Sequence, residues 1–333
     1  MARRGDGGGK KPGWWSLVVL AGAGLAAAGL IKKRKDLRRT APGRALPSST
    51  TTRPSQAPAP PRRALMELPD DVESAWIPAP GGSIRVVQRH ASASAAILFV
   101  HGLGGTLEQW APALDSLPPS WRGVALDLPG HGQSDGIAEA EIDDFADALA
   151  AVIDGLGLRR AVIVAHSFGG TVALRYAGRH RHRVAGLLLV DPNGDQTQLP
   201  ASDRSKLLEA VSRDAHGELG DHFRQVLGSP PEPVEKAVIK GLEETSPEML
   251  HAGLKAAFAY SPLADLDRYA GLVRLVLSPL NDLPFSLQRL RPQLRSAVVR
   301  NVGHWLMLER PAEFAELLDQ FLDSAGERVE RVN

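Results

Sequence analysis

The 333-residue chain contains no cysteine. This absence excludes disulfide bonds, thiolate metal sites, a cysteine nucleophile and a cysteine-linked lipid anchor. Neither sign of charge is in excess, because 39 Lys and Arg residues stand against 38 Asp and Glu residues. The overall charge gives no reason to expect nucleic acid as a partner. The chain also lacks the glycine patterns of nucleotide-binding loops and the spacings of metal ligands, so we expect no cofactor.

The N-terminal region carries an uncharged apolar run at residues 14–31, which begins with two tryptophans and has basic residues on both sides. Its length is at the short end of the roughly 20 residues that span a bilayer. We therefore expect residues 1–39 to be a membrane-associated segment, with 14–31 as a single-pass anchor. The alternative is a signal peptide that is cleaved on export. The basic cluster directly after the run would hinder export and favours the retained anchor.

The side of the membrane follows from the flanking charges. Six cations at residues 32–39 exceed the four before residue 14, which mildly favours a cytoplasmic location for the rest of the chain. Residues 40–64 are rich in Pro, Ser, Thr and Ala and show no apolar periodicity, so we interpret them as an extended linker. The globular domain then occupies residues 65–333.

Short apolar runs alternate with helical patterns through most of this domain. Several runs have no polar alternation, as in AAILFV and GLLLV, which is typical of strands covered on both faces. Strands that alternate with helices predict a mostly parallel, doubly wound α/β sheet. The expected strands lie at residues 72–77, 84–88, 96–101, 123–127, 161–166, 184–191, 272–278 and 297–299, with helices at 141–155, 168–179 and 312–322.

One stretch interrupts the alternation. Residues 192–268 show helical patterning with no convincing strand, and prolines divide the stretch into short helices. We expect this region to be a helical lid above the carboxyl ends of the strands, where active sites of such sheets gather.

The motif with the most chemical content is Ala165-His-Ser167-Phe-Gly169, which lies between an apolar run and a helix. A serine on a sharp turn between a strand and a helix needs small residues two positions before it and two positions after it. Ala165 and Gly169 meet this need. The motif resembles the nucleophile elbow of the α/β-hydrolase superfamily, in which Ala165 replaces the usual glycine. The resemblance implies an α/β-hydrolase fold with Ser167 as the nucleophile.

Two further segments support the same resemblance. The strand at residues 96–101 ends in His101-Gly-Leu103-Gly-Gly, which is similar to the oxyanion loop of that superfamily, and Asp127-Leu-Pro-Gly-His-Gly-Gln-Ser-Asp135 is similar to its next loop. Backbone amides in a glycine-rich turn stabilise the negative charge that develops during acyl transfer. The resemblance implies that the amides of Leu103 and Phe168 form the oxyanion hole.

The remaining members of a catalytic triad follow in the order acid, then histidine. His304 stands in Asn301-Val-Gly-His304-Trp, similar to the segment that carries the superfamily's catalytic histidine. Asp282 lies in the loop after the seventh strand and is the expected acid, although Pro279 replaces the glycine usual there. Asp191, at the end of the sixth strand, is the alternative acid.

These residues predict an enzyme that hydrolyses a carboxylic ester, or a related acyl compound, through an acyl-enzyme. The expected partner is a small-molecule acyl substrate. A peptidase or a C–C bond hydrolase of the same superfamily is one alternative. A membrane-tethered binding protein that keeps the fold without the chemistry is another.

Overall fold

The computed structural model describes residues 66–228 and 230–330. Its centre is an eight-stranded sheet with the order β1-β2-β4-β3-β5-β6-β7-β8. β2 pairs antiparallel with β1 and with β4, and all other neighbours are parallel. The strands are β1 Glu73–Ala79, β2 Gly82–Arg89, β3 Ala95–Val100, β4 Trp121–Leu126, β5 Ala161–His166, β6 Val184–Val190, β7 Leu272–Leu277 and β8 Arg295–Val298.

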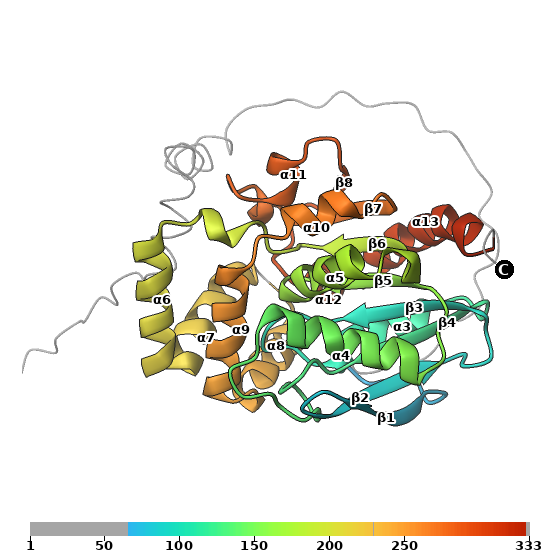
Figure 1. The fold of residues 1–333 in the computed structure, drawn as a ribbon, viewed down its shortest axis with the longest axis horizontal. Helices are drawn as coiled ribbons and strands as arrows, with labels where there is room; N and C mark the ends of the chain where they lie inside the picture. Colours follow the sequence, from blue (N-terminus) through green and yellow to red (C-terminus); the bar gives the residue numbers. More distant parts are fainter. Residues whose placement is uncertain (1–65, 229, 331–333) are drawn as a thin grey trace, which may run out of the picture.

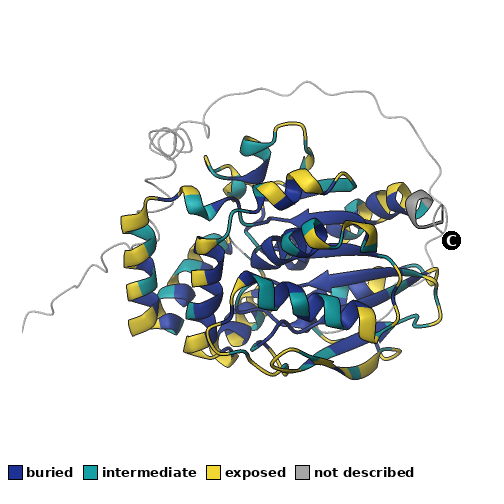
Figure 2. Cartoon of the chain, in the orientation of Figure 1, coloured by how far each residue is buried: buried dark blue, intermediate teal, exposed yellow. Residues whose placement is uncertain are grey.

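The central strands are apolar because both faces of the sheet are covered. Every residue of β5 and of β6 is buried, whereas the edge strand β8 is mostly exposed. Figure 2 shows this contrast, with the middle of the sheet dark blue and the outward faces of the surrounding helices yellow. The continuous apolar runs of the sequence thus correspond to the interior strands.

Helices cover the sheet in two layers (Figure 1). On one face, α4 (Ile142–Gly155), α5 (Phe168–Arg179) and α10 (Leu263–Arg268) contribute side chains to a single apolar core with one side of the strands. On the other face, α3 (Ala111–Ser116), α12 (Leu306–Glu309) and α13 (Pro311–Glu330) do the same. Three 3-10 turns, η1 (Leu107–Trp110), η2 (Arg181–Arg183) and η4 (Pro279–Asn281), and the short helix α11 (Leu287–Leu290) complete the body.

The stretch between β6 and β7 contains no strand. It begins with the 3-10 turn η3 (Gln196–Gln198) and continues with four helices that lie beyond the carboxyl ends of the strands (Figure 1). Proline occupies the first turn of α8 and of α9, where its missing N–H costs nothing. These insertion helices are α6 (Ala201–Arg213), α7 (Ala215–Val226), α8 (Glu232–Glu244) and α9 (Pro247–Ala259).

The predicted fold class is confirmed, and each expected strand overlaps an observed one. The last helix is longer than expected, because it runs to Glu330. The proposed anchor at 14–31 and linker at 40–64 lie outside the described residues. Among the residues that are described, no helix is long and apolar enough to cross a membrane.

Candidate active site

Ser167 stands at the sharp turn between β5 and α5. Its backbone has φ 52° and ψ −120°, a conformation that L-residues seldom adopt. The turn is held by hydrogen bonds from the Ser167 N–H to the Val190 carbonyl (3.0 Å) and from the Gly170 N–H to the Ser167 carbonyl (2.9 Å). Such strain, fixed by the neighbouring strand, lifts the serine hydroxyl out of the sheet and into a pocket.

The small residues around Ser167 are required by close backbone contacts. A Cβ atom added to Gly169 would lie 2.3 Å from the carbonyl oxygen of His101 at the end of β3. A Cβ added to Gly102 would lie 3.0 Å from the Cβ of Ser167. The sequence requirement for a small residue after the serine is therefore confirmed, and Gly102 has a similar reason.

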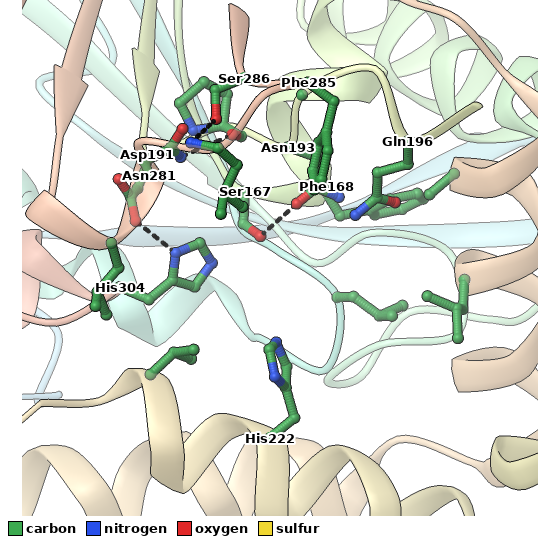
Figure 3. Close-up of a pocket in the computed structure, with 18 of the residues that line it drawn as sticks. Ser167, Phe168, Asp191, Asn193, Gln196, His222, Asn281, Phe285, Ser286 and His304 are labelled. Atoms are coloured by element: carbon green, nitrogen blue, oxygen red, sulfur yellow. Dashed lines mark hydrogen bonds and ion pairs between the residues drawn. The ribbon is translucent and has the colours of Figure 1, made fainter. Parts of the chain in front are cut away.

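His304 and Asp191 form the hydrogen-bonded pair of the site (Figure 3). His304 lies in the loop before α12, and its Nδ1 is 2.6 Å from Oδ2 of Asp191 at the end of β6. Asp191 is 1% exposed, and it also accepts hydrogen bonds from the Ser278 N–H (2.7 Å) and hydroxyl (2.9 Å). With Nδ1–H donated to the carboxylate, Nε2 of His304 is left as the basic nitrogen.

Asp282, the acid expected from the sequence, does not contact His304, and this prediction is corrected. Its carboxylate makes a bidentate ion pair with Arg289 (2.6 and 2.7 Å), and its side chain is 61% exposed. The hydrogen bond from Arg289 holds the pKa of Asp282 below its usual range. The physical reason lies in Pro279, which starts the 3-10 turn η4 after β7 and places Asp282 at the surface. The alternative, Asp191, occupies the position beside His304.

The main chain of His304 is fixed by two different parts of the fold. Its N–H donates to the carbonyl of Val226, the last residue of α7 (2.8 Å). Its carbonyl accepts from Nε2 of His166, the residue before the nucleophile (3.1 Å). Burial lowers the pKa of His166 well below its usual value, so the ring stays neutral and keeps one N–H for this bond. These contacts tie the histidine loop both to the nucleophile strand and to the insertion helices.

The two amides expected to form the oxyanion hole belong to residues that line the same pocket. The N–H of Phe168 is the first of α5 and has no acceptor within the helix. Within the described part of the chain, neither this amide nor that of Leu103 donates a hydrogen bond. His101 fixes the Leu103 loop, because its Nε2 accepts from the Leu128 N–H (3.0 Å) and its Nδ1–H donates to the Gly102 carbonyl (2.7 Å).

The Ser167 hydroxyl donates to Oδ1 of Asn193 at 3.3 Å (Figure 3). Asn193 follows Asp191 by two residues and was not predicted from the sequence. In this arrangement the hydroxyl is directed to Asn193, and no hydrogen bond joins Ser167 to His304, both of which lie in the described part of the chain. Hydrogen bonds between nucleophile and base are often completed only when substrate is bound.

The pocket around these groups has a cavity of about 210 Å³. The insertion helices α7 and α9 supply much of its wall, including Phe223, Val226 and Leu254. His222 of α7 is also in the wall, and burial, with a smaller effect of His304, lowers its pKa to about 3. No sequence motif marked His222. Only the fold brings it to the site.

Comparisons with known proteins agree with this architecture. The family model described as alpha/beta hydrolase fold matches residues 95–244. The acetyltransferase component of the acetoin cleaving system of Cupriavidus necator is 39% identical over 127 residues, which are 38% of this chain and 34% of that protein. Lipase LipV of Mycobacterium tuberculosis is 40% identical over 129 residues, 38% of this chain and 46% of the lipase. The chain thus spans a third to a half of the length of these relatives.

Among solved structures, an esterase from Thermogutta terrifontis superimposes with a TM-score of 0.65 at 22% identity, covering 76% of this chain and 99% of the esterase. At this identity the likeness concerns the fold. With the sheet order and the match of residues 95–244 to the family model, it shows that the chain has the α/β-hydrolase fold. Among the described residues, no group of His, Asp and Glu side chains is arranged to hold a metal ion.

Proposed function

We propose that the protein is a serine hydrolase that cleaves an uncharged carboxylic ester. The observation that supports it most is the combination of Ser167 on a strained elbow with a base that is already oriented, since His304 is 2.6 Å from the buried carboxylate of Asp191. A nucleophile, an adjacent base and a third group that orients the base are the parts that nucleophilic acyl transfer requires.

The mechanism follows from these positions. Ser167 attacks the ester carbonyl while Nε2 of His304 takes its proton, and Asp191 stabilises the imidazolium that forms. The amides of Leu103 and Phe168 stabilise the oxyanion. His304 then protonates the departing alcohol, and a water molecule, activated by the same nitrogen, hydrolyses the acyl-enzyme.

The pocket wall supports an uncharged substrate. Among the described residues that line the pocket, Asp191 is the only Asp, Glu, Lys or Arg, and most of the others are aliphatic or aromatic. A charged acyl group would lose its hydration there without gaining a partner. The similarity to a lipase agrees with ester chemistry but fixes no substrate.

Acyl transfer to an acceptor other than water is a second candidate. It is favoured by the 39% identity to a protein named as an acetyltransferase component. The two candidates share the acyl-enzyme and differ in the second step. Adding a primary alcohol or thiol to the ester assay, and measuring the acylated acceptor by mass spectrometry, separates them: transfer makes the acceptor product in excess of the free acid.

A fluorophosphonate probe tests the proposal directly. We expect labelling of the purified protein at Ser167, hydrolysis of p-nitrophenyl butanoate, and loss of both in Ser167→Ala without loss of the fold. A protein that is folded by circular dichroism but neither labels nor hydrolyses esters would instead be the non-catalytic binding protein. Faster cleavage of an anilide than of the matched ester would indicate a peptidase.

A further inference from the structure

The helix α7 contacts both the active-site pocket and the loop that carries His304. Its residues Phe223 and Val226 line the pocket that contains Ser167. Figure 3 shows that His222 of the same helix points toward His304. At the carboxyl end of the helix, the carbonyl of Val226 accepts a hydrogen bond from the His304 N–H (2.8 Å). One helix is therefore both a wall of the pocket and a support of the base.

The end of α7 and the histidine loop pack backbone against backbone. A Cβ atom added to Gly303 would lie 2.3 Å from the carbonyl carbon of Leu227 and 2.4 Å from the carbonyl oxygen of Val226. Gly228 follows the helix with φ 74°, and a Cβ added there would lie 3.1 Å from the Gly303 nitrogen. Close-packed segments transmit displacement. A shift at the end of α7 therefore reaches the main chain of His304.

Phe223 adds a side-chain link between the pocket wall and the base. Its ring meets the ring of Trp305 edge to face, with 4.9 Å between the centroids. Trp305 follows His304 in the chain, and its ring meets the His304 ring in the same way at 5.1 Å. Phe223 is 8% exposed and Trp305 3%, so both rings are confined. Three rings in contact thus connect the apolar wall to the imidazole of His304.

The position of the histidine loop affects the chemical step. Within the described part of the chain, the Ser167 hydroxyl bonds to Asn193, and no hydrogen bond joins it to His304. The hydroxyl and the base must come within hydrogen-bond distance before the proton is transferred. A substrate group that packs on α7 contacts the helix that holds the main chain of His304, and so it can favour this approach.

On the basis of the proposed function, we infer that Phe223 is a positioning residue that couples the acyl chain of the substrate to the base. An aliphatic acyl chain that packs on Phe223 holds Trp305 and the histidine loop in the arrangement that proton transfer needs. The acyl chain has this role because it stays attached to Ser167 in both chemical steps, whereas the alcohol leaves after the first. The binding energy of the chain then raises kcat and does not only lower KM. The substrate class is an ester whose aliphatic acyl chain is long enough to reach α7.

The test separates kcat from KM in two series of esters. The first is p-nitrophenyl acetate, butanoate and hexanoate, with each rate divided by the hydroxide-catalysed rate of the same ester. Wild-type kcat should rise from acetate to hexanoate by about threefold to tenfold, the range for the energy of one aromatic contact. The second series is ethyl, butyl and hexyl butanoate, measured by pH-stat. It changes only the alcohol, and kcat should stay within about twofold.

Phe223→Ala removes the ring that contacts Trp305. In this variant the ratio of kcat for the hexanoate to kcat for the acetate should fall to about one. Phe258→Ala is the matched control, because Phe258 lines the same pocket and is 3% exposed but lies on α9. Among the described residues, its ring contacts no other aromatic ring. This control should raise KM for the hexanoate and keep the wild-type kcat ratio.

The inference is overturned if wild-type kcat does not depend on acyl length, if it depends on alcohol length instead, or if Phe223→Ala keeps the wild-type ratio. Equal losses of the ratio in Phe223→Ala and Phe258→Ala would also overturn it, because they would indicate a general loss of packing in the pocket. If circular dichroism shows that Phe223→Ala does not fold, Phe223→Leu replaces it, and its ratio should also be below that of wild type. If folded protein takes no fluorophosphonate label at Ser167, the proposed function fails. Labelling and hydrolysis with an unchanged ratio would refute this inference alone.

Discussion

Acid should destabilise this protein below about pH 6.5, because His101, His131 and His166 are buried, His222 is partly buried, and burial disfavours the charged form of each. Burial lowers the pKa of His101 to about 3, of His131 to about 4 and of His222 to about 3, and lowers that of His166 well below its usual value. In the unfolded chain each returns to about 6.5. Below that pH the unfolded state binds four protons that the folded state does not.

The sign follows from linkage. A group whose pKa is depressed by folding contributes stability above its unfolded pKa, and this stability is lost as the pH falls toward the folded pKa. Between pH 7.5 and 5.5, four such groups lower the free energy of unfolding by roughly 5 kcal/mol. Asp127 acts in the opposite direction, since burial raises its pKa to about 6, and it returns about 1 kcal/mol. The net loss of roughly 4 kcal/mol is a large part of the usual total stability of a domain.

Urea unfolding followed by circular dichroism at pH 7.5, 6.5 and 5.5 measures this loss. His222→Phe removes one of the four groups, so the variant should lose about 1 kcal/mol less of its free energy of unfolding over the same pH range. A wild-type free energy of unfolding that changes by less than about 1 kcal/mol would refute the reasoning. It would mean that these histidines are protonated in the folded protein or are not buried.

Four further predictions follow from other parts of the chain. Gly169→Ala should lower the free energy of unfolding by about 1–3 kcal/mol and reduce ester hydrolysis, because the added Cβ would lie 2.3 Å from the His101 carbonyl oxygen. Gly326→Ala is the control and should fold normally, because the nearest atom to its added Cβ would be 3.8 Å away. Thermal unfolding checks both variants. Asp265→Ala should lower the free energy of unfolding by about 3 kcal/mol, because it removes a buried acceptor shared by Arg175, Arg268 and Tyr260. Asp267→Ala, in the same helix, breaks only an exposed ion pair and should lower it by about 0.5 kcal/mol or less. Urea titrations measure both values. Deleting residues 1–39 should move the protein from the membrane fraction to the supernatant with its activity intact, and full-length, uncleaved protein found wholly in the supernatant would contradict the anchor. Asp191→Asn should reduce kcat/KM far more than Asp282→Asn, measured with a p-nitrophenyl ester.

The sequence was sufficient for the parts of the site that local backbone geometry dictates. A buried strand, a tight turn and a helix leave room only for small residues around Ser167, so the pattern at residues 165–169 carries the geometry in itself. The same holds for the parallel strands, whose apolar runs reflect cover on both faces. Asn193 and His222 could not be found in this way. Each reaches the pocket through the course of the insertion, and no short pattern encodes that course.

The acid of the proposed triad is the residue that the sequence alone identified least well, and the Asp191→Asn variant tests its assignment. The carboxyl ends of β6 and β7 are adjacent in the sheet, so an aspartate after either strand is near the histidine loop. Which one pairs with His304 depends on the turn after β7, where Ser278 donates through its amide and hydroxyl to Asp191 and Pro279 directs the chain outward. In Asp191→Asn, the side-chain amide can donate a hydrogen bond to Nδ1 of His304. This favours the tautomer with its proton on Nε2, which can no longer act as the base. We therefore expect kcat/KM to fall by roughly 10⁴. Asp282→Asn loses only an exposed pair with Arg289, so its kcat/KM should stay within about twofold of wild type. If Asp282→Asn were the more damaging change, the acid would come from the loop after β7, and the hydrogen bond between Asp191 and His304 would have to break during catalysis.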